Sequence, residues 1–230
     1  MHPWRARRRA LLRAAAVGVG VSVPVFVLAY LVRAGAPGLQ HADESVVFAA
    51  TTFTREHEPL RDVLIAWQEV FHPRWVNIAG VAVCAWVWRR HALPGRAVWA
   101  VGTLLASWGL TNLLKAVIDR ARPVIDDALV HAPGGSFPSG HATASAVAGV
   151  TLTVLLWPLL GARARVLVPG LAAVLVVATC ADRVLLGAHF PSDVVGGLLL
   201  GAAMAGASAV GYLGLSSSSP VPHPVAEERP

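Results

Sequence analysis

The amino-acid sequence predicts an all-α fold, a polytopic membrane protein whose core is a bundle of six transmembrane helices. Of its 230 residues, 55% are hydrophobic and only 14% are charged, and the mean hydropathy is +0.59. Soluble domains carry about 25% charged residues, so this chain is too apolar to be one. Its apolar residues fall into runs close to the roughly 20 residues that a helix needs to cross a bilayer. These runs cover residues 14–32, 75–92, 97–118, 142–160, 166–181 and 194–215.

The first run follows a basic start and precedes Ala34-Gly35-Ala36, so this segment resembles a secretory signal peptide with a cleavage site. Pro37 comes directly after that site and disfavours cleavage. We therefore expect the first helix to be retained in a single transmembrane domain over residues 1–215. Cleavage would leave the placement of the later helices unchanged.

A shorter, amphipathic helix is predicted between the first two runs. Its apolar residues recur at intervals of three and four, with Arg61, Asp62 and Glu69 on other faces. The apolar positions are Leu60, Val63, Leu64, Trp67, Val70 and Phe71. Such a helix either lies on the outer membrane surface or packs against the bundle, and the sequence leaves both open.

The second and fifth runs are short on a strict apolar count. We expect them to include flanking residues such as Arg89, Arg90 or Arg165, whose long side chains can reach the headgroups. After the sixth run, residues 216–230 are rich in Ser and Pro. This composition predicts a disordered cytoplasmic tail.

The charged residues predict that both termini are cytoplasmic. With the N-terminus inside, the inner segments hold clusters of arginine opposed only by Glu227 and Glu228, and every other acidic residue falls outside. Short cytoplasmic segments of membrane proteins carry this excess of basic residues. The inner arginines are Arg5, Arg7, Arg8, Arg9, Arg13, Arg89, Arg90, Arg96, Arg163, Arg165 and Arg229. We expect a multi-pass protein of the plasma membrane.

The formal net charge of +6 does not predict a nucleic-acid partner, because the basic residues are not arranged along one helix face with interleaved aromatics. The two cysteines, Cys84 and Cys180, lie inside apolar runs without a metal-ligand spacing. Both are predicted to be small buried hydrophobes. The sequence makes no prediction of the oligomeric state.

Three polar clusters interrupt the apolar pattern, and the predicted threading places all of them at the outer side. The first is KAVIDRARP, residues 115–123. Lys115 is the only lysine of the chain, at a helix end where a charge is costly without a partner or a function. Arg122 follows about two helical turns later, so the two cations share a face if the helix continues to Pro123. Either cation alone could equally be an interfacial anchor.

The second cluster is SFPSGHA, residues 136–142, where an apolar run begins. Pro138 and Gly140 shape a turn, and Ser139 is a typical N-cap residue of a helix whose free N–H groups form an anion site. His141 stands at this terminus, which favours the neutral imidazole until a bound phosphate raises its pKa. It is a candidate general acid, although a lone histidine here is more often an interfacial polar residue.

The third cluster is DRVLLGAHFPSD, residues 182–193. Arg183 leads, and Asp193 follows His189 by four residues, so a helix or turn would bring the carboxylate to one ring nitrogen. The other nitrogen would keep an outward lone pair, as in a histidine nucleophile. A structural or metal-binding pair is the alternative. Nearby cations would repel a divalent ion, and no third ligand follows at a useful spacing, so we predict neither a metal nor a cofactor.

In order and spacing, the three clusters resemble the signature of the type-2 phosphatidic acid phosphatase (PAP2) superfamily. The matching residues are Lys115, Arg122-Pro123, the PSGH of 138–141, Arg183, His189 and Asp193. The family's third motif usually begins Ser-Arg, whereas this chain has Asp182 before the arginine. This departure puts a supporting hydrogen bond in doubt, and Asp182 could instead pair with Arg183 and orient it.

The resemblance implies a metal-independent phosphatase with a two-step mechanism. His189 would attack phosphorus, Asp193 would orient it, and His141 would protonate the leaving oxygen and then activate water. The groups expected to hold the phosphoryl oxygens are Lys115, Arg122, Arg183 and the N–H groups of Ser139 and Gly140, with the Ser139 hydroxyl as a further donor.

A site at the outer ends of transmembrane helices lies at headgroup depth, which predicts a lipid phosphate or pyrophosphate as the substrate. Undecaprenyl pyrophosphate, phosphatidylglycerol phosphate and phosphatidic acid are the leading candidates. A lipid phosphotransferase would need only a different acceptor, and a non-enzymatic lipid-binding or transport protein would use the charges along a pathway. Vanadium haloperoxidases share the signature, but those with it are soluble and larger.

Overall fold

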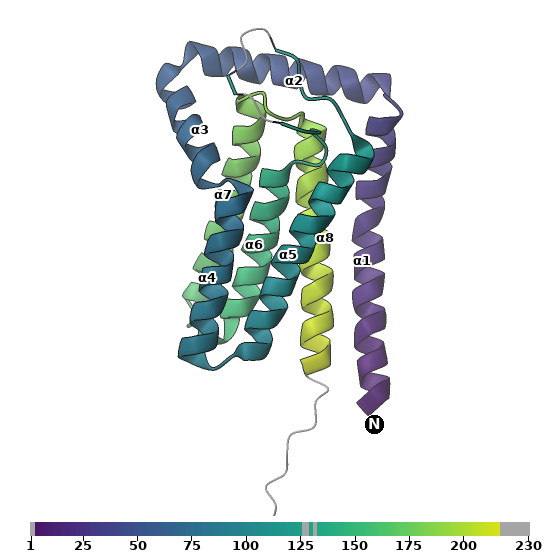
Figure 1. The fold of residues 1–230 in the computed structure, drawn as a ribbon, viewed down its shortest axis with the longest axis vertical. Helices are drawn as coiled ribbons and strands as arrows, with labels where there is room; N and C mark the ends of the chain where they lie inside the picture. Colours follow the sequence, from purple (N-terminus) through teal and green to yellow (C-terminus); the bar gives the residue numbers. More distant parts are fainter. Residues whose placement is uncertain (1–2, 126–128, 131–132, 217–230) are drawn as a thin grey trace, which may run out of the picture.

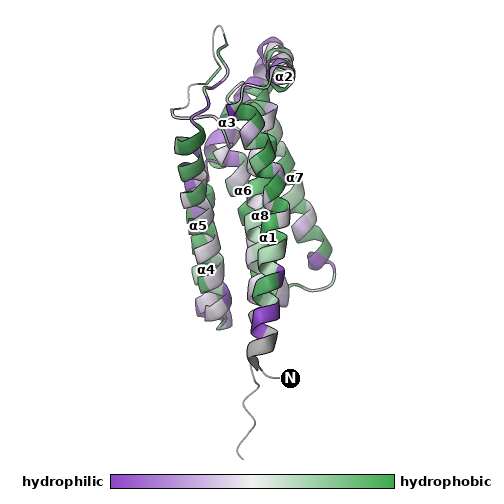
Figure 2. Cartoon of the chain, turned by 90° about the vertical axis from the view of Figure 1, so that its right-hand side faces the viewer, coloured by the Kyte–Doolittle hydropathy of each residue, from purple (hydrophilic) through white to green (hydrophobic). Residues whose placement is uncertain are grey.

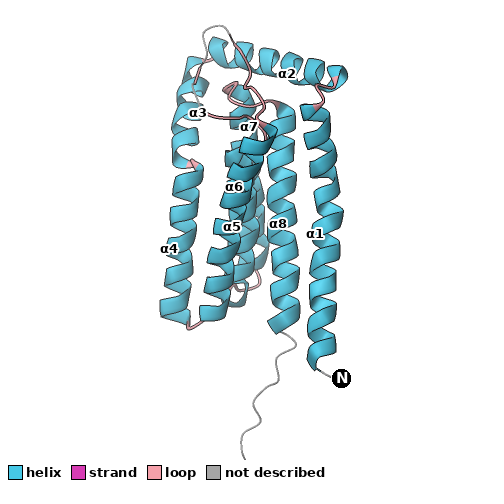
Figure 3. Cartoon of the chain, turned by 45° about the vertical axis from the view of Figure 1, so that its right-hand side comes forward, coloured by secondary structure: helices cyan, strands magenta, loops and turns pink. Residues whose placement is uncertain are grey.

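The computed structural model describes residues 3–125, 129–130 and 133–216, and over these residues the chain is helical without strands (Figure 3). The helices in chain order are α1 (Pro3–Arg33), α2 (Pro37–Glu56), α3 (Glu58–Val70), α4 (Pro73–His91), α5 (Pro94–Ile118), α6 (Gly140–Leu156), the 3-10 turn η1 (Trp157–Leu159), α7 (Ala164–Leu185) and α8 (Pro191–Ser216). Long helices form a bundle, and α2 and α3 lie toward one end of it (Figure 1).

The predicted runs correspond to α1, α4, α5, α6, α7 and α8. Within the described part of the chain, all of these except α4 are long and apolar enough to cross a membrane. The 19-residue α4 contains Asn77 and ends with Arg89 and Arg90, which lower its hydropathy, although it lies beside α5 in the bundle (Figure 1). The all-helical membrane fold is thus confirmed, and the sixth span stays a prediction.

The bundle is built around α6, which contacts α4, α5, α7 and α8, while α1 packs along α8 at the edge (Figure 1). Apolar residues colour the long helices green in Figure 2, and hydrophilic residues gather in α2 and near the start of α1. Cys84 is buried in the core between α4, α5 and α6, as predicted. Cys180 on α7 is only partly buried, because that helix turns most of its surface outward.

Two helices lie between α1 and α4, of which the sequence analysis identified only the second. The unpredicted α2 crosses the end of the bundle (Figures 1 and 3), and its Thr54 hydroxyl donates to the Leu185 carbonyl of α7 at 2.9 Å. The predicted amphipathic helix is α3, whose Trp67 Nε1 donates to Thr179 Oγ1 of α7 at 3.1 Å. Of the two placements left open for it, α3 takes the packed one.

Helices α6 and α8 approach each other closely because α8 carries glycines on the shared face. A Cβ atom on Gly197 would lie 2.6 Å from the Ser139 carbonyl oxygen, and one on Gly201 would lie 2.8 Å from the Thr143 carbonyl oxygen. Any larger residue at either position would push the two helices apart. This contact fixes the start of α6 against the start of α8.

The C-terminal ends of α5 and α7 and the starts of α6 and α8 all lie at the end covered by α2, and α1 begins at the opposite end (Figure 1). The threading predicted from the sequence therefore brings the three polar clusters to one end of the bundle. The predicted disordered tail lies, apart from Ser216, outside the described residues.

Candidate active site

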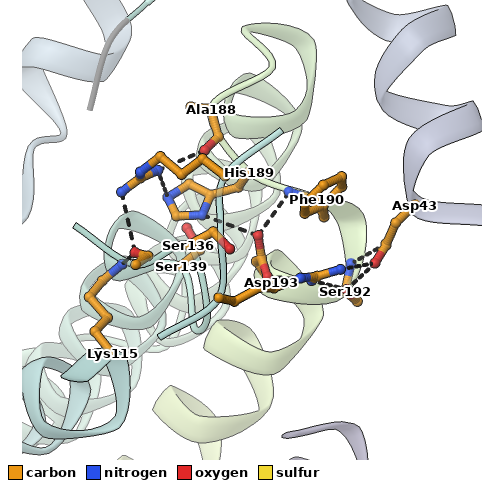
Figure 4. A network of polar contacts seen from close by, with 12 residues as sticks. Asp43, Lys115, Ser136, Ser139, Ala188, His189, Phe190, Ser192 and Asp193 are labelled. Carbon is orange, nitrogen blue, oxygen red and sulfur yellow. Dashed lines mark hydrogen bonds and ion pairs between the residues drawn. The ribbon is translucent and has the colours of Figure 1, made fainter. Parts of the chain in front are cut away.

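The two cations of the first cluster meet through a loop and not along a helix. α5 ends at Ile118, in agreement with the predicted run of 97–118, and Asp119 takes a left-handed conformation with φ of 45°, so the helix does not continue to Pro123 as a shared helix face would require. The loop folds back so that Lys115 Nζ donates to the Gly135 carbonyl at 2.7 Å, and Arg122 Nε donates to the Gly134 carbonyl at 3.1 Å. Both side chains are thus fixed by carbonyls of the segment that leads into α6 (Figure 4).

His189 is held between a carboxylate and a guanidinium. Asp193 Oδ2 lies 3.6 Å from His189 Nδ1, and Arg122 NH1 lies 3.3 Å from His189 Nε2. The carboxylate side favours a proton on Nδ1, and the arginine, which can only donate, favours a lone pair on Nε2. The predicted pairing of His189 with Asp193 is present, and the free nitrogen faces the cation cluster (Figure 4).

The surroundings of His189 keep its imidazole neutral. The residue is only 3% exposed, and burial lowers its pKa to about 4, with Arg122 and Lys115 acting in the same direction and Asp193 opposing them. A neutral imidazole is the form that can act as a nucleophile.

The start of α6 agrees with the prediction that Ser139 is an N-cap residue but not with the role predicted for its N–H group. Ser139 is the N-cap residue of α6, but its N–H donates to the Asp193 carbonyl at 2.9 Å. The expectation that this N–H holds a phosphoryl oxygen is therefore wrong for this structure. The buried Ser139 Oγ has no hydrogen-bond partner among the described residues, so of the donors predicted to hold phosphate at this terminus, the hydroxyl and the Gly140 N–H remain.

His141 lies on the side of α6 that faces the turn between α3 and α4. Its Nε2 is 3.2 Å from the Gln68 carbonyl oxygen, and its ring meets His72 edge-on with centroids 5.4 Å apart. A carbonyl can only accept, so Nε2 carries the proton and Nδ1 is the nitrogen that can gain one. These two partners could not be predicted from the sequence, because Gln68 lies on α3 and His72 just after its end, and the placement of that helix was open.

Arg183 is buried and paired with its neighbour. Its Nε donates to Asp182 Oδ2 at 2.7 Å, and NH2 contacts the same oxygen. Asp182, which stands in place of the family's serine, therefore orients the arginine, as the sequence analysis allowed.

The site also contains three polar residues that were not predicted from the sequence, namely Arg120, Asp43 and Ser192. Arg120 binds Asp193 Oδ1 at 2.6 Å and Asp43 Oδ2 at 2.8 Å, and Ser192 contacts both Arg120 and Asp43. Arg120 stands two residues before Arg122 in the first cluster, and this spacing was the only available signal. Asp43 belongs to the unpredicted α2.

Two cavities adjoin the cation cluster. The larger, about 640 Å³, lies between α1, α2 and the loop after α5, with Arg120 and Arg122 beside apolar residues such as Leu31, Val32, Leu39 and Phe48. The smaller, about 170 Å³, reaches Lys115 and Gly140 between α4, α5 and α6. In the described parts of the chain, no group of three or more His, Cys, Asp or Glu side chains could hold a metal ion.

Comparison with known proteins shows that the chain is similar to phosphatases. The chain is 32% identical over 129 residues to "Putative undecaprenyl-diphosphatase YbjG" of Escherichia coli (strain K12), covering 53% of this chain and 59% of that protein. It is 38% identical over 95 residues to phosphatidylglycerophosphatase B of Bacillus subtilis (strain 168), covering 40% and 46%. The chain thus spans about half the length of these curated relatives.

A solved structure and a family model extend the likeness to the fold and to the signature. The crystal structure of a transmembrane PAP2-type phosphatidylglycerolphosphate phosphatase from Bacillus subtilis superposes with a TM-score of 0.74 at 27% identity, covering 83% of this chain and 93% of that one. The PAP2 superfamily model matches residues 96–214, a range that contains all three polar clusters. Because this range is more than half of the 230 residues, the chain belongs to the PAP2 superfamily.

Proposed function

We propose that the protein is a membrane lipid phosphatase that hydrolyses a lipid phosphate or pyrophosphate through a phosphohistidine at His189. One observation carries this proposal: a buried, neutral histidine has a carboxylate at Nδ1 and a cation cluster at Nε2. The carboxylate stabilises the positive charge that develops on the ring during attack, and the cations stabilise the charge on the phosphoryl oxygens.

In the first step, Nε2 of His189 forms a bond to phosphorus while the bond from phosphorus to the leaving oxygen breaks. The phosphoryl group takes the place beside Nε2 that Arg122 NH1 now faces at 3.3 Å. The groups that hold its oxygens are Lys115, Arg122, Arg183, the Ser139 hydroxyl and the Gly140 N–H. His141, once protonated at Nδ1, donates that proton to the leaving oxygen.

In the second step, water attacks the phosphorus and the bond from Nε2 to phosphorus breaks, which releases phosphate and regenerates His189. His141 accepts the proton of the attacking water and so returns to its starting protonation state for the next cycle. These steps use only side chains and water, and we propose that they proceed without a metal ion.

The larger cavity supports a lipid as the substrate. Arg120 and Arg122 line it together with apolar side chains of α1, of α2 and of the loop after α5, so an anionic headgroup and an apolar tail both find matching surfaces. Named activities of the relatives fit this class, since they are an undecaprenyl-diphosphatase and phosphatidylglycerol phosphate phosphatases. We propose undecaprenyl pyrophosphate, phosphatidylglycerol phosphate and phosphatidic acid as the substrates to test.

We also propose that the site faces the outer side of the plasma membrane and that both termini are cytoplasmic. Arginines cluster at the end of the bundle away from the site, among them Arg89, Arg90, Arg96 and Arg165. Eleven of the 13 acidic residues belong to the other side in the predicted threading. Labelling of single cysteines introduced at Ala92 and at Asp119 in intact cells would test this, with only the second expected to react.

The experiment that tests the activity is phosphate release from the three lipids by purified protein in EDTA, with His189→Ala beside the wild type. We expect release to persist in EDTA and to fall about 1,000-fold or more in His189→Ala, because the nucleophile is lost. His91→Ala, at the opposite end of the bundle, is the matched control and should keep full activity. An acid-labile phosphoenzyme should form in the wild type and in His91→Ala but not in His189→Ala.

The outcomes separate the proposed function from its rivals. No release from any lipid by folded protein would contradict the phosphatase, and release only after addition of a lipid acceptor would indicate a phosphotransferase. Loss of release in EDTA that Mg²⁺ restores would contradict the metal-independent mechanism.

A further inference from the structure

We infer that Arg120 and Asp43 are positioning residues, which hold the Asp193 carboxylate in the orientation that His189 requires. This inference rests on the proposed function, because it assigns a role within the same reaction. It concerns residues outside the three-part signature, one of them on a helix that precedes the matched family region.

Asp193 is buried and hydrogen-bonded at both of its carboxylate oxygens. The carboxylate is 0% exposed, and a buried charge is stable only if it is paired and hydrogen-bonded. Oδ2 accepts the Phe190 N–H at 2.9 Å and faces His189 Nδ1 at 3.6 Å. Oδ1 binds Arg120 NH1 at 2.6 Å. Arg120 therefore fixes one oxygen of Asp193 and turns the other toward the histidine.

Arg120 is itself held in place by Ser192 and Asp43. Its NH1 also donates to Ser192 Oγ at 2.7 Å, and its NH2 donates to Asp43 Oδ2 at 2.8 Å. The guanidinium carbon lies 4.2 Å from the centroid of the Phe190 ring. Because a planar guanidinium can bind two carboxylates at fixed angles, these contacts leave Arg120 little freedom to move away from Asp193.

Asp43 also contacts the start of α8 directly. This residue of α2 is 2% exposed, and its Oδ1 accepts the Ser192 N–H in the first turn of α8 at 2.9 Å. The N–H groups of a first turn lack partners inside the helix, so Asp43 caps α8 from outside. The cap fixes the turn that carries Asp193, and Figure 4 shows Ser192 and Asp193 between Asp43 and His189.

The charges of the cluster suit the reaction. Asp43 and Asp193 bring two negative charges and Arg120 one positive charge, so the cluster keeps one net negative charge beside the neutral His189. That charge is available to stabilise the positive charge that the ring gains when it attacks phosphorus. Without Asp43, Arg120 would neutralise Asp193 and weaken this stabilisation.

The test measures kcat, KM and the melting temperature of Arg120→Ala, Arg120→Lys, Asp43→Asn and the double variant of Arg120→Ala with Asp43→Asn. We expect kcat to fall about 10- to 100-fold in the single variants, as when a residue that orients an active-site histidine is removed, with KM within about threefold. The loss in the double variant should be smaller than the product of the two single losses, because Asp43 acts in part through its contact with Arg120 and in part through the Ser192 N–H. Guanidinium at millimolar concentration should restore part of the kcat of Arg120→Ala.

Arg96→Gln is the matched control for a lost arginine contact. Arg96 donates to the Val154 carbonyl at 2.7 Å, away from the site, so its loss should lower the melting temperature and leave kcat unchanged. If the Arg120 variants raise KM at constant kcat, Arg120 binds substrate and the inference is wrong. The inference is also wrong if the Arg120 variants lower the melting temperature but leave kcat unchanged, as is expected of Arg96→Gln.

A second readout separates failure of this inference from failure of the proposed function. In protein labelled with ¹⁵N-histidine, the His189 signal, assigned with His189→Gln, should show the proton on Nδ1 in the wild type. It should show a mixture or a proton on Nε2 in Arg120→Ala and Asp43→Asn. An unchanged tautomer would overturn the inference, whether or not the wild type hydrolyses any lipid. Absence of hydrolysis together with the expected tautomer change would overturn only the function.

Discussion

At the scale of single residues, the chemistry of the site depends on how the environment of His189 balances burial against charge. Burial, Arg122 and Lys115 lower the pKa of His189 to about 4, and Asp193 acts against them. The cations that would bind phosphate thus also keep the nucleophile unprotonated before the substrate arrives. Once an anionic phosphoryl group sits among them, their effect on the histidine is partly cancelled.

The low pKa of His189 predicts how the protein responds to acid. Because the folded pKa is about 4 and the ordinary value is about 6.5, His189 should remain neutral between pH 8 and about pH 5. ¹⁵N-histidine spectra recorded over this range test the prediction, with the signal assigned by His189→Gln. A His189 signal that titrates near pH 6.5 would contradict it.

The lowered pKa of His189 also makes the free energy of unfolding depend on pH. Between about pH 6.5 and pH 4, the unfolded chain binds a proton at His189 that the folded chain does not, so the free energy of unfolding should fall as the pH is lowered through this range. His189→Gln removes the titrating group. We expect its melting temperature to depend less on pH than that of the wild type.

The residues that carry the chemistry could be predicted from the sequence, but most of their partners could not. Spacing alone indicated that His189 and Asp193 would meet, and their nitrogen and oxygen lie 3.6 Å apart. Arg120 could not be identified from the sequence, because nothing in the local sequence distinguishes it from an arginine at a membrane interface. Its role depends on Asp43, which lies 77 positions earlier in the sequence, and no local pattern indicates such a contact.

At the scale of elements, the apolar runs predicted the long helices, including the end of α5 at Ile118, whereas α2 was missed. α2 is not among the helices apolar enough to span a membrane, and tertiary contacts such as Thr54 with Leu185 hold it in place. After α5, Asp119 leaves the helical conformation, so Lys115 and Arg122 meet through a loop and not on one helix face. These outcomes are set by long-range packing, which local patterns do not report.

The close packing of α6 on α8 predicts that Gly197→Ala disturbs the site through the helices. The added methyl group would lie 2.6 Å from the Ser139 carbonyl and 3.0 Å from Thr143 Oγ1, and the helices would separate at the point where Ser139 contacts Asp193. We expect a loss of about 1–3 kcal/mol in unfolding free energy and a clear fall in kcat. Thermal unfolding and phosphate release measure the two effects.

Gly206→Ala, on the same helix, is the matched control. No atom lies within 4 Å of a Cβ added there, and alanine favours helix more than glycine does by about 1 kcal/mol. The variant should be at least as stable and as active as the wild type. Equal losses in the two variants would show that the contact with α6 is not the cause.

At the scale of the whole molecule, the bundle positions the polar site residues, and α1 and α2 form part of the neighbouring cavity. The bundle places four helix ends together, and α1 with α2 adds an apolar boundary to the cavity at that end. The basic residues Arg120 and Arg122 come from the first polar cluster, whereas the apolar boundary comes from α1 and α2, in which no motif was identified. The sequence therefore indicated the reaction more fully than it indicated how a lipid would be accommodated.

If the larger cavity holds the tail of the substrate, narrowing it should affect lipids and spare small substrates. Ala36 lines this cavity just before α2, and Ala36→Trp would fill part of its volume of about 640 Å³. We expect kcat/KM for a long-chain lipid phosphate to fall about tenfold, which corresponds to about 1.4 kcal/mol, and that for a water-soluble aryl phosphate to stay unchanged. Ala34→Trp, two residues earlier and outside the cavity lining, should change neither value. A parallel loss for both substrates in Ala36→Trp would instead mean that the substitution distorts the catalytic residues, and the tail would have to lie elsewhere.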